Sequence, residues 1–333
     1  MSFALTAEQR QFGATLHELL TAADVPAAAR AWAAGEPGQG LAIWRALAAA
    51  GVTGLVVPPS AGGLGAHPVD LVVACEELGH HPVPGPVAES VAAVPVLLSR
   101  LGVLGTELAG LSGGDLIATL ARPPLLPYAL DAEVAGLVLL ADSGQVWRAL
   151  PEVAVRSMDP ARRLSALRPG QLVADQAEAA ISTATRYGTL ASAALLLGAG
   201  RGLLEISVNH AKTRHQFGRP IGSFQAIKHQ LADVLIAVEF ARPLLRAAAV
   251  AIGADSATAA RDLSAARIAC ADAARLAARV ALGVHGAIGY TQECDVSLWL
   301  AKVRALSSIW GSQAEHRAVV LAALTEPETG PWS

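Results

Sequence analysis

Apolar and polar residues follow three different patterns along the chain. Residues 5–113 are rich in alanine and have a helical period, interrupted by turn sequences such as Glu36-Pro37-Gly38. In residues 114–175, short apolar runs lie between Pro, Gly and Asp, which predicts strands at 116–120, 136–140 and 153–155. The helical pattern then returns in long blocks, at 181–213, 224–253, 257–285 and 294–322. Long helices joined by short loops are typical of an antiparallel bundle.

These patterns predict a mainly α-helical protein with a small β domain. We expect an N-terminal helical domain at 1–113, a reduced middle β domain at 114–176 and a C-terminal four-helix bundle at 177–333. A chain of 333 residues is longer than a single hydrophobic core usually supports, which agrees with several packed units.

Composition adds a prediction of large buried surfaces, some of them shared between subunits. Hydrophobic residues make up 53% and charged residues 16% of the chain, and the mean hydropathy is +0.43. No membrane span is predicted, because the best apolar run, Leu190 to Gly200, ends at Arg201 and a span needs about 20 residues. The sequence Met1-Ser2-Phe3-Ala4 has no export pattern, so we expect a cytoplasmic protein.

Charge and cysteine content exclude other classes. The net charge is −3 and no basic run occurs, which argues against nucleic acid as a partner. The cysteines Cys75, Cys270 and Cys294 have neither metal-ligand spacing nor a disulfide framework. We expect them to be buried thiols in a reducing compartment.

Glycine motifs punctuate the N-terminal region. Gly54-Leu55-x-Val57-Pro58 follows Trp44-x-x-Leu47-Ala48-x-x-Gly51, and Gly62-Gly63-x-Gly65 comes next. The Gly62-Gly63 pair predicts a turn that needs positive φ. Glu76-Glu77-Leu78-Gly79 predicts a helix that ends at a C-cap glycine.

Two segments of the C-terminal region carry candidate binding chemistry. The first, Arg214-His215-Gln216-Phe217-Gly218-Arg219-Pro220-Ile221-Gly222-Ser223-Phe224-Gln225, follows a long predicted helix. Its guanidinium groups can clamp phosphate oxygens and its aromatic rings can cover a base. The second, Val284-His285-Gly286-Ala287-Ile288-Gly289-Tyr290-Thr291-x-Glu293, is a glycine-rich turn at a helix end.

These motifs, in the order helix, β, helix, resemble the acyl-CoA dehydrogenase family. The resemblance covers most of 5–113 and 178–320 and is poor in the middle. It implies FAD as cofactor and the α,β-desaturation of an acyl-CoA thioester. It also implies that the first segment contacts the flavin nucleotide mainly of a neighbouring subunit, with Arg214 on the pyrophosphate and Phe217 by the adenine. The cofactor-binding residues implied are Arg214, Phe217, Ile221, Phe224, Gln225, Gly283, Val284, His285, Gly286 and Ala287.

The sequence departs from the family pattern at both ends of the cofactor. Gly283 stands where the family usually has a flavin-contacting Gln, and Ala287 replaces the second glycine of the turn, which predicts weaker contacts. The family's Thr/Ser-Glu-Pro-Gly-x-Gly-Ser loop, which holds the isoalloxazine ring, has no counterpart at 120–124. Residues 159–164 do resemble the family's strand end and turn, and there we interpret Arg162-Arg163 as a solvated surface pair.

The catalytic carboxylate of the family is missing from both of its usual positions. One position precedes a Gly-Thr or Gly-Ser pair; here Trp310 precedes Gly311-Ser312, and 300–314 contains no acid. The other falls near Gly188, and 181–192 contains no acid either. Glu315 is a weak substitute base. We expect Glu293 to cap a helix that begins at residue 294, and the imidazoles of His210 and His285 to be structural.

The resemblance therefore implies a subunit that lacks the catalytic base and completes the FAD site of a partner. The partner would be a second acyl-CoA dehydrogenase-like chain that carries the Glu and most of the acyl-CoA site, in an α2β2 heterotetramer. Paired subunits of this kind often act on bulky substrates such as steroid side-chain thioesters. Two alternatives stay open: an active homo-oligomer with an unusual base such as Glu315, and a non-enzymatic scaffold of the same fold.

Overall fold

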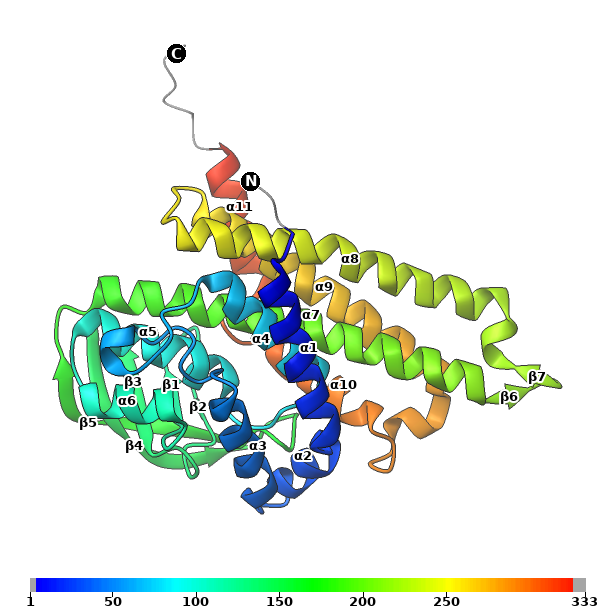
Figure 1. Cartoon of the computed structure of the whole chain (residues 1–333), viewed down its shortest axis with the longest axis horizontal. Helices are drawn as coiled ribbons and strands as arrows, with labels where there is room; N and C mark the ends of the chain where they lie inside the picture. Colours follow the sequence, from blue (N-terminus) through cyan, green and yellow to red (C-terminus); the bar gives the residue numbers. More distant parts are fainter. Residues whose placement is uncertain (1–3, 326–333) are drawn as a thin grey trace, which may run out of the picture.

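The N-terminal part of the protein is helical, as predicted. A computed structural model describes residues 4–325 of the chain (Figure 1). Thr6 starts the first helix through a capping box, because its hydroxyl accepts the Gln9 N–H at 3.2 Å and the Gln9 side chain accepts the Thr6 N–H at 3.1 Å. The elements are α1 (Ala7–Ala22), α2 (Val25–Ala33), α3 (Gly38–Ala49), η1 (Pro59–Ala61), α4 (Pro68–His80), the π-helix η2 (Ala88–Ala93), α5 (Val94–Leu101) and α6 (Gly105–Gly113).

A small sheet follows the helices. Its strands are β1 (Ala118–Ala121), β2 (Ala129–Leu130), β3 (Leu137–Asp142), β4 (Gln145–Val155) and β5 (Leu164–Ala174). Their order in the sheet is β1-β3-β4-β5-β2; β1 and β3 are parallel and the other pairs are antiparallel. Three of these strands overlap the predicted runs. β2 and β5 were not predicted, because β5 contains Pro169-Gly170 and is stabilised by its pairing with β4 rather than by an apolar pattern.

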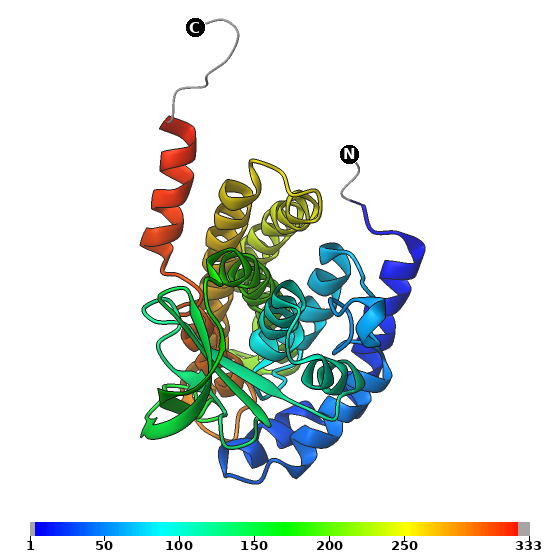
Figure 2. The ribbon, with the colours of Figure 1, turned by 90° about the vertical axis from the view of Figure 1, so that its left-hand side faces the viewer.

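The C-terminal part is the helical bundle. Its elements are α7 (Glu178–Thr213), β6 (His215–Gln216), β7 (Arg219–Pro220), η3 (Ile221–Ser223), α8 (Gln225–Gly253), α9 (Ala259–His285), η4 (Gly286–Tyr290), α10 (Val296–Leu306) and α11 (Gln313–Thr325). The long helices α7, α8 and α9 pack on one another, and α10 packs against α7 and α9. Figure 2 shows the sheet beside the bundle and α11 projecting away from the body of the protein.

One predicted helix is wrong, because the block 294–322 is two helices. α10 ends at Leu306, and the backbone then turns through Trp310 (φ 57°) and Gly311 (φ 97°) before α11 begins at Gln313. The expected role of Glu293 is wrong as well. α10 begins at Val296, the residue at its N-cap is Asp295, and Asp295 forms an ion pair with Arg30 at 2.7 Å.

Close backbone contact between α4 and α7 holds the N-terminal domain on the bundle. The sequence suggested that Gly79 caps the end of α4. In the structure Gly79 lies inside the helix. A Cβ on Gly79 would lie 2.1 Å from the Leu195 carbonyl oxygen, and one on Gly198 would lie 1.9 Å from that of Glu76. Glycine is therefore required at both positions for the two helices to approach. α7 is long and apolar enough to cross a membrane, yet 72% of its most apolar stretch is buried inside the protein, as in a core helix.

The changes of secondary structure fall near the predicted domain limits. α6 ends at Gly113 and β1 begins at Ala118; β5 ends at Ala174 and α7 begins at Glu178. The limits of the three domains themselves, 113/114 and 176/177, stay a prediction.

Candidate cofactor-binding and active site

The segment 214–225 forms an exposed corner between α7 and α8. Arg214 leaves α7 in an extended conformation, and its carbonyl accepts the N–H of Ile221 at 2.8 Å, which closes the β6–β7 hairpin. Phe217 (φ 54°) and Gly218 (φ 78°) form the tip of the hairpin, where Phe217 is 89% exposed. Two positive φ angles are what a tight hairpin turn requires, so the sequence around Gly218 specifies the corner.

The side chains of this corner are available to a ligand to different degrees. Arg214 and Gln225 are exposed, and the Arg214 guanidinium has no hydrogen bond or ion pair within residues 4–325. Phe224 is half-buried; the ring of Phe217 meets it edge-on at 6.1 Å between centroids, and the guanidinium carbon of Arg219 lies 4.1 Å above its centroid. Ile221 is buried and supports the corner from below.

The glycine-rich turn lies at the same end of the bundle (Figure 1). α9 ends at His285, whose ring stacks on that of His210, one turn before Arg214, with 4.2 Å between centroids. His285 Nδ1 lies 2.8 Å from the Ala281 carbonyl oxygen, which accepts its N–H. Burial lowers the pKa of His210, and the neighbouring His285 and Arg214 act in the same direction. The stack thus joins the two segments that the sequence predicted to share one site, and it gives both imidazoles a structural role.

The residues of the turn present mainly backbone to the outside. Gly283, Gly286 and Ala287 are exposed, whereas the side chains of Val284 and His285 are buried. Gly286 adopts φ 64°, and a Cβ on Gly283 or Gly286 would meet no heavy atom within 4 Å. Val284 and His285 can therefore reach a cofactor only through backbone groups. An unpaired guanidinium, an exposed ring and open backbone together fit the adenine and pyrophosphate end of a dinucleotide.

The two positions where the family holds its catalytic carboxylate are in contact with each other. Trp310 is fully buried, and its ring packs directly on Gly188 of α7. A Cβ on Gly188 would lie 2.4 Å from Cη2 and 2.5 Å from Cζ3 of that ring. The indole therefore fills the space that a side chain at either position would occupy.

Two carboxylates, Glu89 and Glu315, lie near these positions. Glu89 of η2 lies beside the Trp310 indole; it is only 2% exposed, and burial raises the pKa of its carboxyl. No sequence signal pointed to Glu89, which stands in an apolar run. Glu315 accepts the Ser312 N–H at 2.7 Å while its own N–H reaches the Ser312 hydroxyl at 3.2 Å. That backbone hydrogen bond lowers the pKa of Glu315, as expected for a capping box at the start of α11.

The middle domain offers little to an isoalloxazine ring. The segment after β1 is a tight turn, closed by Arg122 N–H to Leu126 O at 2.7 Å and Leu126 N–H to Arg122 O at 2.8 Å. The prediction of a solvated Arg162-Arg163 pair is wrong: Arg162 is buried, and Arg163 binds Glu133 at 3.0 Å and approaches Asp131 at 3.6 Å.

Comparison with known proteins identifies the class. The family model "Acyl-CoA dehydrogenase, N-terminal domain" matches residues 6–107, and "Acyl-CoA dehydrogenase, C-terminal domain" matches residues 178–325. The acyl-CoA dehydrogenase IpdE2 of Mycobacterium tuberculosis is 32% identical over 316 residues, which cover 92% of this chain and 94% of that protein. The chain belongs to the acyl-CoA dehydrogenase family.

Solved structures share the fold at lower identity. A chain of the ChsE4-ChsE5 complex from Mycobacterium tuberculosis has a TM-score of 0.81 at 22% identity, over 98% of this chain and 100% of that one. A chain of the Tcur3481-Tcur3483 steroid ACAD, a G363A variant, has a TM-score of 0.83 at 21% identity, over 96% and 98% of the two chains. The predicted architecture of helical domain, small β domain and helical bundle is thereby confirmed.

Proposed function

We propose that this chain is the subunit of a heteromeric, FAD-dependent acyl-CoA dehydrogenase that lacks the catalytic base. The observation that carries the proposal is the packing of Trp310 on Gly188, because neither position of the family's base holds a carboxylate and the indole fills the space between them. Removal of a weakly acidic α-proton needs a positioned carboxylate. A partner subunit of the same family would supply it, together with most of the acyl-CoA site.

The contribution of this chain to the flavin would be the nucleotide end. Arg214 would bind the pyrophosphate, Phe217 and Phe224 would cover the adenine, and the backbone at Gly283 and Gly286 would approach the same half. When bound, FAD supplies the acceptor for the β-hydride of the thioester. The tight turn at 122–126 leaves the isoalloxazine ring to be held by the partner.

An apolar face of α8 supports the pairing with a second subunit. Ile236, Phe240 and Leu244 recur every four residues on the outer side of this helix, and Phe240 is 74% exposed. The helix follows directly on the segment 214–225, so a subunit docked there would bring its flavin to Arg214. Contiguous exposed apolar side chains of this kind are typical of protein interfaces. We propose an α2β2 heterotetramer in the cytoplasm.

The substrate class is inferred from the relatives. ChsE4-ChsE5 is a two-component complex and Tcur3481-Tcur3483 is named a steroid ACAD. We propose that the heteromer containing this chain acts on a bulky acyl-CoA, such as the thioester of a steroid-derived side chain.

Co-expression with an acyl-CoA dehydrogenase-like chain encoded beside this one tests the proposal. The isolated protein should be nearly colourless, and the complex should hold about one FAD per pair of chains, measured by the flavin absorbance. In the complex, removal of the partner's Glu should lower turnover by orders of magnitude, as expected for loss of the proton acceptor. Stoichiometric flavin and desaturation of acyl-CoA by the isolated chain would refute the proposal in favour of an active homo-oligomer. A complex without flavin would refute it in favour of a scaffold.

A further inference from the structure

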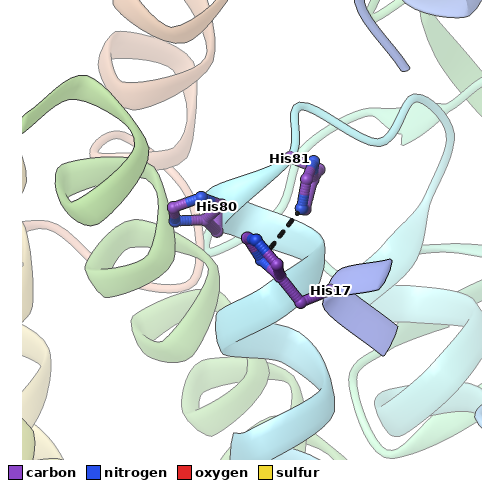
Figure 3. A group of neighbouring side chains, drawn as sticks. All are labelled: His17, His80 and His81. Atoms are coloured by element: carbon purple, nitrogen blue, oxygen red, sulfur yellow. Dashed lines mark hydrogen bonds between the residues drawn. The ribbon is translucent and has the colours of Figure 1, made fainter. Parts of the chain in front are cut away.

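Three histidines outside the segment 214–225 lie close together. His17 lies on α1, and His80 and His81 lie at the end of α4 (Figure 3). Consecutive residues of a helix point in different directions, but α4 ends at His80 and His81 is extended (φ −100°, ψ 132°), and both rings lie close to that of His17. One ring nitrogen of each histidine lies within 4.8 Å of one ring nitrogen of the other two.

The separation of the His17 and His81 nitrogens matches that of two ligands of one metal ion. His17 Nδ1 lies 3.3 Å from His81 Nε2 and 3.1 Å from Glu77 Oε2. Two ligands of a tetrahedral zinc ion, each bound at about 2.0–2.1 Å, are about 3.3–3.4 Å apart. The rings are inclined to one another by 55–65°, with centroids 5.0–5.1 Å apart, so they surround a common centre rather than stack.

His80 supplies an observation independent of this clustering. His80 is only 7% exposed, and its Nε2 lies 3.2 Å from Glu205 Oε2. Its Nδ1 is buried without a hydrogen-bond partner within residues 4–325. A buried polar atom without a partner costs about 1–3 kcal/mol, so a packed cluster alone leaves Nδ1 unexplained. An imidazole that binds a metal through one nitrogen commonly donates its other N–H to a carboxylate, which is the arrangement of His80 and Glu205.

The cationic side chain beside the cluster is paired with carboxylates. Arg201 faces the cluster from α7, but it is neutralised by Glu77 at 2.8 Å and by Glu76 at 3.0 Å.

We propose that His17, His80 and His81 form a binding site for one Zn²⁺ ion that ties α1 to α4. Imidazole nitrogen is a ligand that suits zinc among the divalent metals of the cell. His17 is partly exposed, so the ion can enter from solvent. Three imidazoles leave the fourth position of a tetrahedral ion to water, and the role of the site is independent of the flavin.

The experiment uses the full-length chain, without a polyhistidine tag, stripped with chelator and then loaded with Zn²⁺ alone. We expect one zinc per chain after gel filtration, a higher Tm, and with Co²⁺ alone the intense visible absorption of a four-coordinate ion. His17→Ala and His81→Gln should each lower the affinity at least tenfold. Glu205→Gln, which touches only His80, should weaken binding about 10–100-fold, the scale found for carboxylates behind a metal-bound histidine.

A matched control is His229→Ala, which removes an exposed histidine of α8. It should leave zinc affinity unchanged. Both His17 and His81 are partly exposed, so their variants should remain folded, and circular dichroism verifies this. Zinc content no higher in the parent protein than in His17→Ala, or equal affinity in all variants, would overturn the proposal and leave the cluster as packing.

Discussion

Replacing Gly188 with alanine tests directly whether the Trp310 ring occupies the space at the two positions where the family holds its catalytic carboxylate. The new methyl carbon would lie 2.4–2.7 Å from three atoms of the Trp310 ring, well inside van der Waals contact. The ring cannot move outward freely, because Trp310 is 0% exposed and its backbone oxygen lies 3.0 Å from His316 Nε2. Either the ring or α7 must shift by about 1 Å to reach a normal carbon–carbon separation of about 3.5–4.0 Å.

Two contributions of opposite sign determine how much Gly188→Ala changes the free energy of unfolding. Overpacking of a well-filled core by one carbon costs about 1–3 kcal/mol. Alanine in a helix interior is favoured over glycine by about 0.8–1.0 kcal/mol, which offsets part of that cost. The net loss in the free energy of unfolding should be about 0–2 kcal/mol, read as a fall of a few degrees at most in Tm.

A second glycine of the same helix separates the two terms. A Cβ on Gly200 would lie 3.4 Å from its nearest neighbour, Cα of Ala274, which is close to ordinary contact. Gly200→Ala should therefore show mainly the helix gain and be neutral or slightly stabilising. Denaturant and thermal unfolding of Gly188→Ala, Gly200→Ala and the double variant Gly188→Ala/Trp310→Ala provide the comparison. If Gly188→Ala is as stable as Gly200→Ala, the indole does not occupy the base position and our argument fails.

Three further variants test the site and the electrostatics. Arg214→Ala should weaken FAD retention in the complex about 10–100-fold, since a charge-assisted contact contributes about 1.5–3 kcal/mol, while Arg317→Ala should not; equal flavin affinity in fluorescence titrations would make the corner purely structural. Glu315→Gln should leave turnover of the complex within about threefold, because the carboxylate caps α11 at Ser312; lost turnover in a folded, flavin-loaded complex would make Glu315 the base. Burial raises the pKa of Asp131 to about 6, so the folded protein keeps a proton that the unfolded chain has released above pH 3.8, and stability falls as pH rises from about 4 to 6. The Asp131→Asn variant has no titrating group at this position, so its free energy of unfolding relative to that of the parent should rise by up to about 3 kcal/mol between pH 4 and 7. A pH-independent difference in unfolding midpoints would contradict the assignment.

Local patterns in the sequence predicted the order of the helical and β regions and the residue types at the corner 214–225. The periods of α7, α8 and α9 identify long helices because each buries one continuous face, and the Gly218 turn follows from the backbone angles that only certain residues adopt easily. The absence of a carboxylate at the family's two usual positions was also visible, since it depends only on which residue stands at a position. The break between α10 and α11 was missed, because Trp310 and Gly311 interrupt an otherwise helical composition with positive φ angles that alanine-rich flanks conceal.

Contacts between distant segments were decided by the tertiary structure alone. Gly79 has the pattern of a helix cap, and only the approach of α7 to α4 explains it as a contact residue inside the helix. In the sequence, Trp310 and Gly188 are two separate positions without the expected carboxylate. Only the fold shows that these two residues are in contact. His17 lies more than sixty residues before His80 and His81, so no spacing rule could join them. Neighbouring residues determine the local backbone conformation, whereas packing depends on which surfaces the whole chain brings together.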